Sequence, residues 1–570
     1  MDKPIIQFKD FSFKYDSQKS PTLNNINLSI YPGEKILIVG PSGSGKSTLA
    51  HCLNGLIPSS YKGKFSGEFL INNEEAFSKN IFDRSKMIGT VLQDPDSQFV
   101  GLTVGEDIAF SLENDATPKD IMENKVKIYA FKVDMLEKLK SSIHEISGGQ
   151  KQRAALAGVL VDDVDVLLFD EPLANLDPHT GKLAIELIDR MHEETKKTIV
   201  IIEHRIEDVL HRPVDRVIVM NDGKIVMNTS PDKILSSSVL TDVKLREPLY
   251  ITALKDAGVV IHEDMHASRL DQLFLNDKEK QKVLSWFNNQ HDFLEPQQDE
   301  VLLELRNLNF SYDGSSMLLK NINLKIYKGE MISLVGKNGA GKSTLAKVIT
   351  GIEKHSKGNI IMQGRDIGKA SIAERASNIG LVMQNPNNMI SKVLIYDEVA
   401  LGLRLRGFSE DEVQKKVYET LKICGLYSYR NWPISALSFG QKKRVTIASI
   451  LSLKPSILIL DEPTAGQDLK HYTDIMNFLK ELNKLGITIV LITHDMHLMM
   501  EYTQRAVVLT DGKIISDDTP VNILGDEEII KKANLKQTSL YYLADYVGIK
   551  EREKFVARFI HSEEVKRDVN

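Results

Sequence analysis

Short apolar runs alternate with amphipathic, helix-like stretches along the chain, and the same succession occurs twice. The predicted interior strands are the runs 36–39, 164–169, 198–202, 332–335, 456–460 and 488–492. Short apolar runs between helices are typical of a parallel sheet that is covered on both faces. Each half also opens with predicted antiparallel β structure (5–30 and 302–326) and contains a predicted helical insert (about 104–143 and about 397–429). The pattern therefore predicts an α/β protein built from two similar halves.

Equivalent residues of the two halves keep a nearly constant spacing, which indicates an internal duplication. The spacing is 296 residues for a lysine pair and 290 or 291 for the pairs that follow it: Lys46 and Lys342, Gln93 and Gln384, Ser147 and Ser438, Asp170 and Asp461, His204 and His494. The similarity extends to 249–259 and 539–549, so we expect a C-terminal helical appendix in each half. The predicted domains are 1–247, an appendix and linker at 248–300, a second domain at 301–533 and a second appendix at 534–570, with the boundary near the polar stretch 295–300.

Composition narrows the classes of function. The chain has 570 residues, is 42% hydrophobic and carries a formal net charge of −6, so bulk basicity gives no reason to expect a nucleic-acid partner. Its two cysteines, Cys52 and Cys424, lie in different halves, which fits a reducing compartment and argues against a disulfide framework. No apolar run approaches the roughly 20 residues of a membrane helix. Any membrane role is therefore expected to depend on partner subunits.

A glycine-rich loop between a predicted strand and a predicted helix occurs once in each half. The two loops consist of Gly40, Pro41, Ser42, Gly43, Ser44, Gly45, Lys46, Ser47 and Thr48, and of Gly336, Lys337, Asn338, Gly339, Ala340, Gly341, Lys342, Ser343 and Thr344. Glycines let backbone N–H groups turn inward around phosphate oxygens, and the helix N-terminus adds partial positive charge. The lysine can reach the β- and γ-phosphates, and the serine hydroxyl can bind Mg²⁺.

Two further motifs complete the candidate chemistry of the first half. Asp170 and Glu171 end an apolar strand, where an aspartate can hold the Mg²⁺ shell and the next acid can polarise an attacking water. Ser147 is predicted to cap a glycine-rich helix start, which would form a second anion-binding site. The helix N-terminus at the phosphate loop and the one capped by Ser147 cannot both bind the same γ-phosphate within one half. The second helix start therefore requires a partner.

These motifs resemble those of ATP-binding cassette (ABC) ATPases, and the second half repeats them. The resemblance implies ATP and Mg²⁺ as ligands, two working sites and the following roles for residues of this chain. The catalytic residues would be Glu171, Glu462, His204, His494, Gln93 and Gln384. Besides the two loops, ATP would be bound by Tyr15, Tyr312, Ser147, Gly148, Gly149, Gln150, Ser438, Phe439, Gly440 and Gln441. Mg²⁺ would be held by Ser47, Gln93, Asp170, Ser343, Gln384 and Asp461. Taken alone, Tyr15 would be read as a core aromatic and His204 as an ordinary histidine.

The resemblance also implies that the halves pair head to tail, so that Lys46 faces Ser438 and Lys342 faces Ser147. The D-loop of the first half would be Asn175, Leu176 and Asp177. The segment that begins at Ser147 matches the signature motif of the family, and in the second half Phe439 replaces its first glycine. The D-loop region 465–469 of the second half lacks the proline that the first half has at Pro178. We therefore expect two unequal sites, neither of them inactive.

Within the ABC ATPases, the stretches 91–100 and 103–110 are similar to the ATPases of energy-coupling factor (ECF) importers. That resemblance implies a peripheral ATPase at the cytoplasmic face of the cell membrane, bound to an integral coupling subunit and a substrate-binding membrane subunit. The cargo would be a vitamin, a vitamin precursor or a transition-metal ion. Gln93 matches the Q-loop glutamine of the family. The acids that follow it either line a groove that receives a basic coupling helix or form a solvated loop: Asp94, Asp96, Glu106 and Asp107.

The alternative is a soluble tandem ABC ATPase that acts on ribosomes. Such proteins share the ATP motifs but usually join their halves by a long charged helical hairpin. Residues 262–300 are short and mixed instead, with apolar clusters at 271–275 and 283–287. The sequence therefore favours the importer subunit.

Overall fold

The computed structural model describes residues 3–174, 176–291, 300–314 and 316–569. It divides the chain into two compact units, one of Met1–Asn289, Asp468–Lys470 and Asp545–Gly548, the other of Gln290–Gln467, His471–Ala544 and Ile549–Asn570. Asn175 of the expected D-loop and most of the boundary stretch, 295–299, lie outside the described residues. Each unit is considered by itself.

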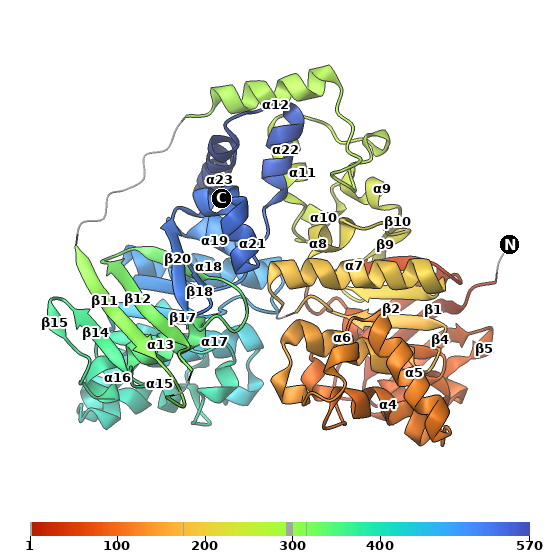
Figure 1. The fold of residues 1–570 in the computed structure, drawn as a ribbon, viewed down its shortest axis with the longest axis horizontal. Coiled ribbons are helices and arrows are strands. Elements are labelled where there is room, and N and C mark those ends of the chain that lie inside the picture. Colours follow the sequence, from red (N-terminus) through yellow and green to blue (C-terminus); the bar gives the residue numbers. More distant parts are fainter. Residues whose placement is uncertain (1–2, 175, 292–299, 315, 570) are drawn as a thin grey trace. The chain divides into compact units, whose positions relative to one another are not determined.

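The first unit contains a six-stranded sheet and a four-stranded sheet (Figure 1). In spatial order the larger sheet consists of β10 (Lys224–Thr229), β9 (Arg216–Asn221), β3 (Lys35–Val39), β8 (Thr198–Ile202), β7 (Val166–Asp170) and β6 (Ile88–Val91). The smaller sheet, which is antiparallel, consists of β2 (Leu23–Ile30), β1 (Ile6–Tyr15), β4 (Gly63–Ile71) and β5 (Glu74–Glu75). The predicted α/β architecture with an antiparallel subdomain is confirmed.

The second half repeats both sheets with the same strand order. Its larger sheet consists of β20 (Lys513–Asp518), β19 (Arg505–Thr510), β13 (Met331–Val335), β18 (Thr488–Ile492), β17 (Ile457–Asp461) and β16 (Ile379–Val382). Its smaller sheet consists of β12 (Leu319–Tyr327), β11 (Val301–Phe310), β14 (Lys357–Met362) and β15 (Arg365–Asp366). Identical strand order in both halves is the structural counterpart of the repeated sequence motifs.

Helices connect the strands in both halves. Those of the first half are α1 (Lys46–Leu53), α2 (Leu56–Ser59), α3 (Ile81–Ser85), α4 (Val104–Asn114), α5 (Lys119–Lys132), α6 (Gly148–Leu160), α7 (Pro178–Thr195), α8 (Ile206–Leu210), α9 (Pro231–Leu235), α10 (Val239–Asp242), α11 (Leu249–Asp256) and α12 (Asp277–Asn289). Those of the second half are α13 (Lys342–Thr350), α14 (Ile372–Arg375), α15 (Ile395–Leu405), α16 (Glu410–Ile423), α17 (Phe439–Leu451), α18 (Leu469–Lys484), α19 (Met496–Tyr502), α20 (Pro520–Gly525), α21 (Glu527–Ala533), α22 (Ser539–Val547) and α23 (Arg552–Val569). The repeated tail sequences form α11 and α22, as the predicted appendices require.

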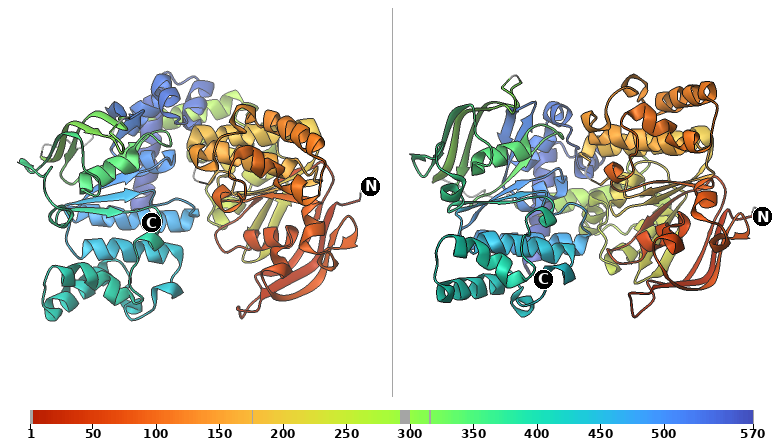
Figure 2. Two further views of the ribbon diagram at one scale, coloured as in Figure 1. Left: turned by 60° about the horizontal axis from the view of Figure 1, so that its bottom comes forward. Right: turned by 90° about the horizontal axis from the view of Figure 1, so that it is seen from below.

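The helical insert and the antiparallel sheet lie at opposite ends of each unit. Figure 2 shows this for the second unit, where the green strands and the teal helices α15 and α16 are well separated in both views. The phosphate-loop strands β3 and β13 lie inside the larger sheets, between parallel neighbours on both sides. Their C-terminal ends therefore present the glycine-rich loops at a fixed edge of each sheet.

One edge of each larger sheet departs from the predicted parallel arrangement. The hairpins β9–β10 and β19–β20 are antiparallel. Every second residue of β10 is exposed, so this strand has no continuous apolar run. The periodicity that identified the buried interior strands could not reveal it.

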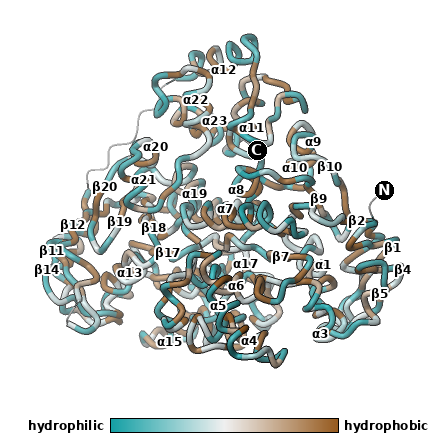
Figure 3. The backbone as a smooth tube through the Cα atoms, turned by 45° about the vertical axis from the view of Figure 1, so that its right-hand side comes forward, coloured by the Kyte–Doolittle hydropathy of each residue, from teal (hydrophilic) through white to brown (hydrophobic). Residues whose placement is uncertain are grey.

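The cores between the two sheets differ in composition. The first is rich in phenylalanine, and the rings of Phe8 and Phe69 stack at 4.2 Å with an interplanar angle of 2°. In the second core Leu305 and Ile360 stand in place of these rings. Figure 3 shows the interior strands as mainly hydrophobic and the helices as mixed. Among the described residues, no helix has both the length and the apolar character needed to cross a membrane.

Candidate functional site

The first glycine-rich loop holds its lysine at the centre of a turn. Lys46 begins α1, and its Nζ donates to the carbonyl oxygens of Gly40 (2.6 Å) and Pro41 (3.0 Å). Its side chain is almost fully buried. Burial lowers the pKa of Lys46, and the carboxylates of Glu171 and Asp170 oppose that effect. The ammonium is therefore fixed at the mouth of the loop, between backbone oxygens and acids.

Glycine is required at two points of this loop. A Cβ on Gly40 would lie 2.4 Å from the carbonyl oxygen of Met220, and Gly45 has a φ of 99°. Gly45 also precedes the first residue of α1 and leaves the N-terminal N–H groups of that helix uncovered by a capping side chain. Such N–H groups favour an anion.

The loop fits a phosphate group. The hydroxyl oxygen of Ser44 is buried and has no hydrogen-bond partner among the described residues, although a buried hydroxyl is ordinarily bonded. A phosphate oxygen at the start of α1 would satisfy it. We infer this fit from the loop itself, together with the helix N-terminus behind it.

The second loop has nearly the same geometry. Lys342 Nζ donates to the carbonyl oxygens of Gly336 (2.6 Å) and Lys337 (3.1 Å), and Gly341 has a φ of 102° at the start of α13. A Cβ on Gly336 would lie 1.9 Å from the carbonyl oxygen of Leu509. The two loops are therefore equivalent in the position of the lysine.

Two acids end the strand beside each loop, as predicted. Asp170 is the last residue of β7 and Asp461 the last of β17, and the glutamate that follows has a positive φ of 50° (Glu171) or 49° (Glu462). The backbone N–H of each glutamate donates to the next strand, to Ile202 or Ile492 (both 2.9 Å). The left-handed conformation turns the glutamate out of the strand and is typical of functional sites.

The predicted glutamine and histidine lie against the glutamate in the first unit. Gln93 Nε2 donates to Glu171 Oε2 (2.6 Å), and His204 Nδ1 lies 3.5 Å from Glu171 Oε1. In the second unit His494 Nδ1 lies 2.7 Å from Glu462 Oε1. Gln384 follows β16 by two residues, as Gln93 follows β6. The structure thus brings three of the predicted catalytic groups together in the first unit and two in the second.

The serine and aspartate expected to hold Mg²⁺ are adjacent in the second unit. The hydroxyl of Ser343 is hydrogen-bonded to Asp461, which opposes the rise that burial causes in the pKa of this carboxyl. In the first unit, burial raises the pKa of Asp170 to about 6, and the neighbouring charge of Glu171 adds to the effect. A hydroxyl and a carboxylate beside a phosphate loop suit Mg²⁺, which combines one or two carboxylates with substrate phosphates and water.

The signature segments form exposed helix starts. Ser147 caps α6 and Ser438 caps α17, each within a capping box closed by Gln150 or Gln441. Phe439 is the first residue of α17 and remains 45% exposed. The predicted N-cap Ser147 is confirmed, Ser438 repeats it in the second half, and the exposed position of both leaves them accessible to a ligand.

The two aromatic residues expected to stack on adenine have different surroundings. The hydroxyl of Tyr15 lies 3.1 Å from Thr48 Oγ1, and its ring packs edge-on against Tyr61 at 6.2 Å. Tyr312 makes the equivalent contact with Thr344 at 3.4 Å and is 60% exposed. Tyr15 is half-buried, so the aromatic surface is less open in the first unit.

Sequence reasoning missed three buried residues that support the glutamates. In the first unit Glu203 accepts hydrogen bonds from the N–H groups of Leu173 (2.9 Å) and His204 (3.0 Å), whereas Thr493 takes its place in the second. Gln152 donates to the carbonyl of Pro172, and the corresponding Lys443 donates to two carbonyls. These residues lie inside motifs that the sequence does reveal, but their partners other than His204 lie 19 to 30 positions away in the sequence.

The acids proposed to receive a coupling helix have local partners. Asp107 Oδ1 accepts from the N–H groups of Val100 and Gly101, Glu106 closes the capping box of α4, and Asp96 pairs with Lys151 (2.5 Å). Asp94 caps a short turn by accepting from the N–H of Asp96. These acids therefore help to shape their own loop, and the two interpretations of them, a groove for a coupling helix or a solvated loop, stay predictions.

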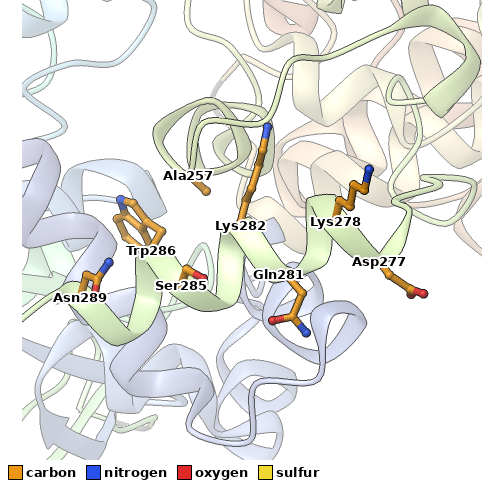
Figure 4. Close-up of a pocket in the computed structure, with 8 residues that line it drawn as sticks. All are labelled: Ala257, Asp277, Lys278, Gln281, Lys282, Ser285, Trp286 and Asn289. Atoms are coloured by element: carbon orange, nitrogen blue, oxygen red, sulfur yellow. The ribbon is translucent and has the colours of Figure 1, made fainter.

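A pocket of about 600 Å³ follows α12 and contains none of the predicted site residues (Figure 4). It is lined by Ala257, Asp277, Lys278, Gln281, Lys282, Ser285, Trp286 and Asn289. Lys282 Nζ donates to the carbonyl of Gly258 (2.8 Å), which ties α12 to the end of α11. The pocket therefore lies on the helical appendix of the first half, away from the predicted nucleotide site.

Comparison with protein families gives two matches. The ABC transporter family matches residues 23–174 and 319–465, and a family described as ATP-binding cassette cobalt transporter matches residues 237–310.

Similar full-length proteins are named as ABC transporter ATP-binding proteins. One from Clostridium perfringens is 56% identical over 98% of both chains. One from Streptococcus pneumoniae is 55% identical over 96% of this chain and 97% of its own. Among solved structures, cbiO1 from Clostridium perfringens, described as part of the ABC transporter complex cbiONQ, is 38% identical and covers 41% of this chain and 95% of its own, with a TM-score of 0.38.

Proposed function

Because this chain belongs to the ABC transporter family as an ATP-binding protein with two cassettes, we propose that it is the energy-coupling ATPase of an ECF-type membrane importer. In this proposal each half hydrolyses ATP, and the two sites form head to tail: Lys46 with Ser438, and Lys342 with Ser147. The enzymatic part rests on one observation made in each unit. The glutamate beside the phosphate loop lies against the predicted catalytic histidine, Glu171 against His204 and Glu462 against His494.

The residues of each loop would bind and orient the nucleotide. The lysine and the helix N-terminus would hold the β- and γ-phosphates, and Tyr15 or Tyr312 would stack on the base. Mg²⁺ would be held by Ser47, Gln93 and Asp170 in one half and by their counterparts Ser343, Gln384 and Asp461 in the other. When bound, it neutralises charge on the transferring phosphoryl group.

The glutamate after the strand would accept a hydrogen bond from the attacking water and orient it. Glu462 already lies 2.7 Å from His494, so the histidine can fix the direction of the carboxylate and contact the γ-phosphate. Water attack then yields ADP and phosphate. ATP would contribute contacts to a closed pair of cassettes that ADP lacks, and this difference would drive the conformational cycle.

Exposed apolar side chains support a docking site for membrane partners near each Q-loop. Leu102 is 80% exposed and Val100 is 61% exposed in the first unit, and Val393 is 74% exposed at the corresponding segment of the second. Such residues are rarely left uncovered when they lie together. We propose that an integral coupling subunit covers them at the cytoplasmic face of the membrane and that a separate membrane subunit binds the substrate.

The match to the cobalt-transporter family supports a transition-metal ion as cargo, and the ECF resemblance equally supports a vitamin or its precursor. The cargo would be bound by the membrane subunits, because the predicted sites of this chain are built for a nucleotide. The proposal therefore commits to import of a small, scarce nutrient rather than to one molecule.

The test is affinity purification of the tagged full chain from detergent-solubilised membranes, followed by ATPase assay of the complex. The wild-type complex is expected to contain integral membrane proteins and to hydrolyse ATP, whereas Glu171→Gln with Glu462→Gln is expected to co-purify the same proteins without hydrolysis. Recovery with ribosomal particles and no membrane protein would overturn the importer role.

A further inference from the structure

We propose that Lys443 is a positioning residue for hydrolysis in the second half, which links the signature helix α17 to the turn that carries Glu462. This inference rests on the proposed function, since it assigns a role in ATP hydrolysis. The counterpart of Lys443 in the first half, Gln152, makes one hydrogen bond of the same kind, to the carbonyl of Pro172.

The side chain of Lys443 runs through the interior of the second unit. It is 1% exposed, and its Nζ donates to the carbonyl oxygens of Glu462 and Pro463, both at 2.7 Å. Lys443 belongs to the second turn of α17, five residues after the N-cap Ser438. A single side chain therefore joins a rigid helix to the peptide of the proposed catalytic residue.

A lysine at this position places a charged group in the protein interior. Burying an ammonium group is unfavourable unless it is well compensated, and burial lowers the pKa of Lys443 to about 8. The compensation comes from the two carbonyls, from the charges of Glu462 and Asp461, and from the ring of Phe439 at 5.7 Å. Packing alone does not require it, because the first half fills the equivalent position with a neutral glutamine that reaches the carbonyl of Pro172.

The position of the anchored turn matters for chemistry. Glu462 has a positive φ of 49°, and its carboxylate lies 2.7 Å from His494. Two short hydrogen bonds to the carbonyls on either side of the Glu462–Pro463 bond hold this peptide against rotation. The direction of the carboxylate thus depends on where α17 stands, and a charged donor makes this dependence stronger than a neutral one.

In the proposed head-to-tail arrangement, Ser438 at the start of α17 contacts the nucleotide of the first half. Lys443 would then connect the nucleotide at one site with the glutamate of the other. The second half would respond more strongly to such a displacement of its signature helix than the first half.

The experiment uses the full chain in complex with its membrane subunits, with Glu171→Gln present so that only the second half hydrolyses ATP. Lys443→Met removes both donors at similar length, and Lys443→Gln introduces the residue that the first half uses. We expect each to lower kcat about tenfold while KM for ATP stays within twofold, because the positioning of the glutamate is lost and nucleotide binding is not.

The pH profile separates positioning by a charge from mere packing. In the Glu171→Gln background the rate should fall above about pH 8 as Lys443 loses its proton, and Lys443→Gln should remove this alkaline decline. The charged groups that act on Lys443 are the carboxylates of Glu462 and Asp461, which oppose the effect of burial on its pKa.

The matched variant in the first half is Gln152→Lys in a Glu462→Gln background. A cavity of about 260 Å³ lies beside Gln152, so the longer side chain has room. We expect this variant to acquire the alkaline decline that Lys443→Gln loses.

The inference would be overturned if both Lys443 variants kept kcat within twofold and an unchanged pH profile. It would equally be overturned if they lowered the unfolding temperature and changed kcat and KM together, as a structural role predicts. If instead neither the Glu171→Gln nor the Glu462→Gln parent hydrolysed ATP while the wild type also failed, the proposed function would be wrong rather than this assignment.

Discussion

The two nucleotide sites agree in the groups that would react and differ in the groups behind them. The loop lysines make the same pair of hydrogen bonds within 0.1 Å, and both glutamates leave their strands with a φ near 50°. Behind the glutamate, however, the first half has Glu203 and Gln152 where the second has Thr493 and Lys443. The duplicated halves thus share the candidate reacting groups and differ in the charges behind them.

By these two substitutions the formal charge behind the glutamate is more negative by two in the first half than in the second. Glu203 adds a buried negative charge near Asp170 and Glu171, and the pKa of Asp170 rises to about 6 by burial with help from these neighbours. In the second site Lys443 offsets the acids. Sites with equal reacting groups are therefore expected to respond differently to pH, to Mg²⁺ and to movement of the helices.

The largest expected effect tests whether both sites react. Lys46→Ala and Lys342→Ala should each lower hydrolysis at their own site by roughly 10²–10³-fold, because each removes a fixed positive charge from the transferring phosphate. Phosphate release by each single variant and by the double variant measures this. Lys9→Ala, an exposed change on β1, is the control. If either single variant retained the full rate, the corresponding half would not be a working site.

The next effect concerns Glu203. Glu203→Thr, which copies the second half, leaves the N–H groups of Leu173 and His204 without their acceptor and should lower the free energy of unfolding by about 1–3 kcal/mol. Thermal unfolding of the nucleotide-free protein measures the loss, and Glu193→Thr on the exposed side of α7 serves as control. Equal unfolding temperatures for the two variants would show that the buried acid has no supporting role.

A third prediction follows from the raised pKa of Asp170. An acid whose pKa is higher in the folded state than in the unfolded state, where it is about 3.9, destabilises the fold when it is ionised. Metal-free and nucleotide-free wild type should therefore gain stability relative to Asp170→Asn as the pH falls from about 7 through 6 towards 4. The gain is expected to be about 1–2 kcal/mol, measured by denaturant unfolding at each pH. A constant difference between the two proteins across this range would contradict the raised pKa.

The smallest effect distinguishes the signature glycines. A Cβ on Gly149 would lie 2.3 Å from Thr180 Cγ2, whereas one on Gly440 would meet His471 at an ordinary 3.7 Å. Gly440→Ala should raise the free energy of unfolding by up to about 1 kcal/mol through helix propensity, and Gly149→Ala should not. Calorimetry of the two variants measures the contrast, and equal gains would mean that Thr180 moves aside freely.

The sequence was sufficient for the parts of the molecule that local pattern determines. Buried strands such as β7 and β8 have continuous apolar runs, and the N-caps Ser147 and Ser438 have their glutamine three residues later, so both were predictable. The half-exposed edge strands were not, because their alternation resembles a polar loop. The supporting residues Glu203 and Lys443 were missed for another reason. A buried charge is recognised by its partners, and Leu173, Glu462 and Pro463 are distant from these residues in sequence.

The backbone of Glu171 and Glu462 has a consequence for how such a protein could lose activity. A left-handed residue other than glycine carries a torsional load of about 1–2 kcal/mol, which glycine at the same position would relieve. Replacement of the glutamate by glycine would therefore stabilise the fold. A half that no longer needed to hydrolyse ATP could lose the acid without losing stability. Both halves keep the glutamate in this conformation, as we would expect if both hydrolyse ATP.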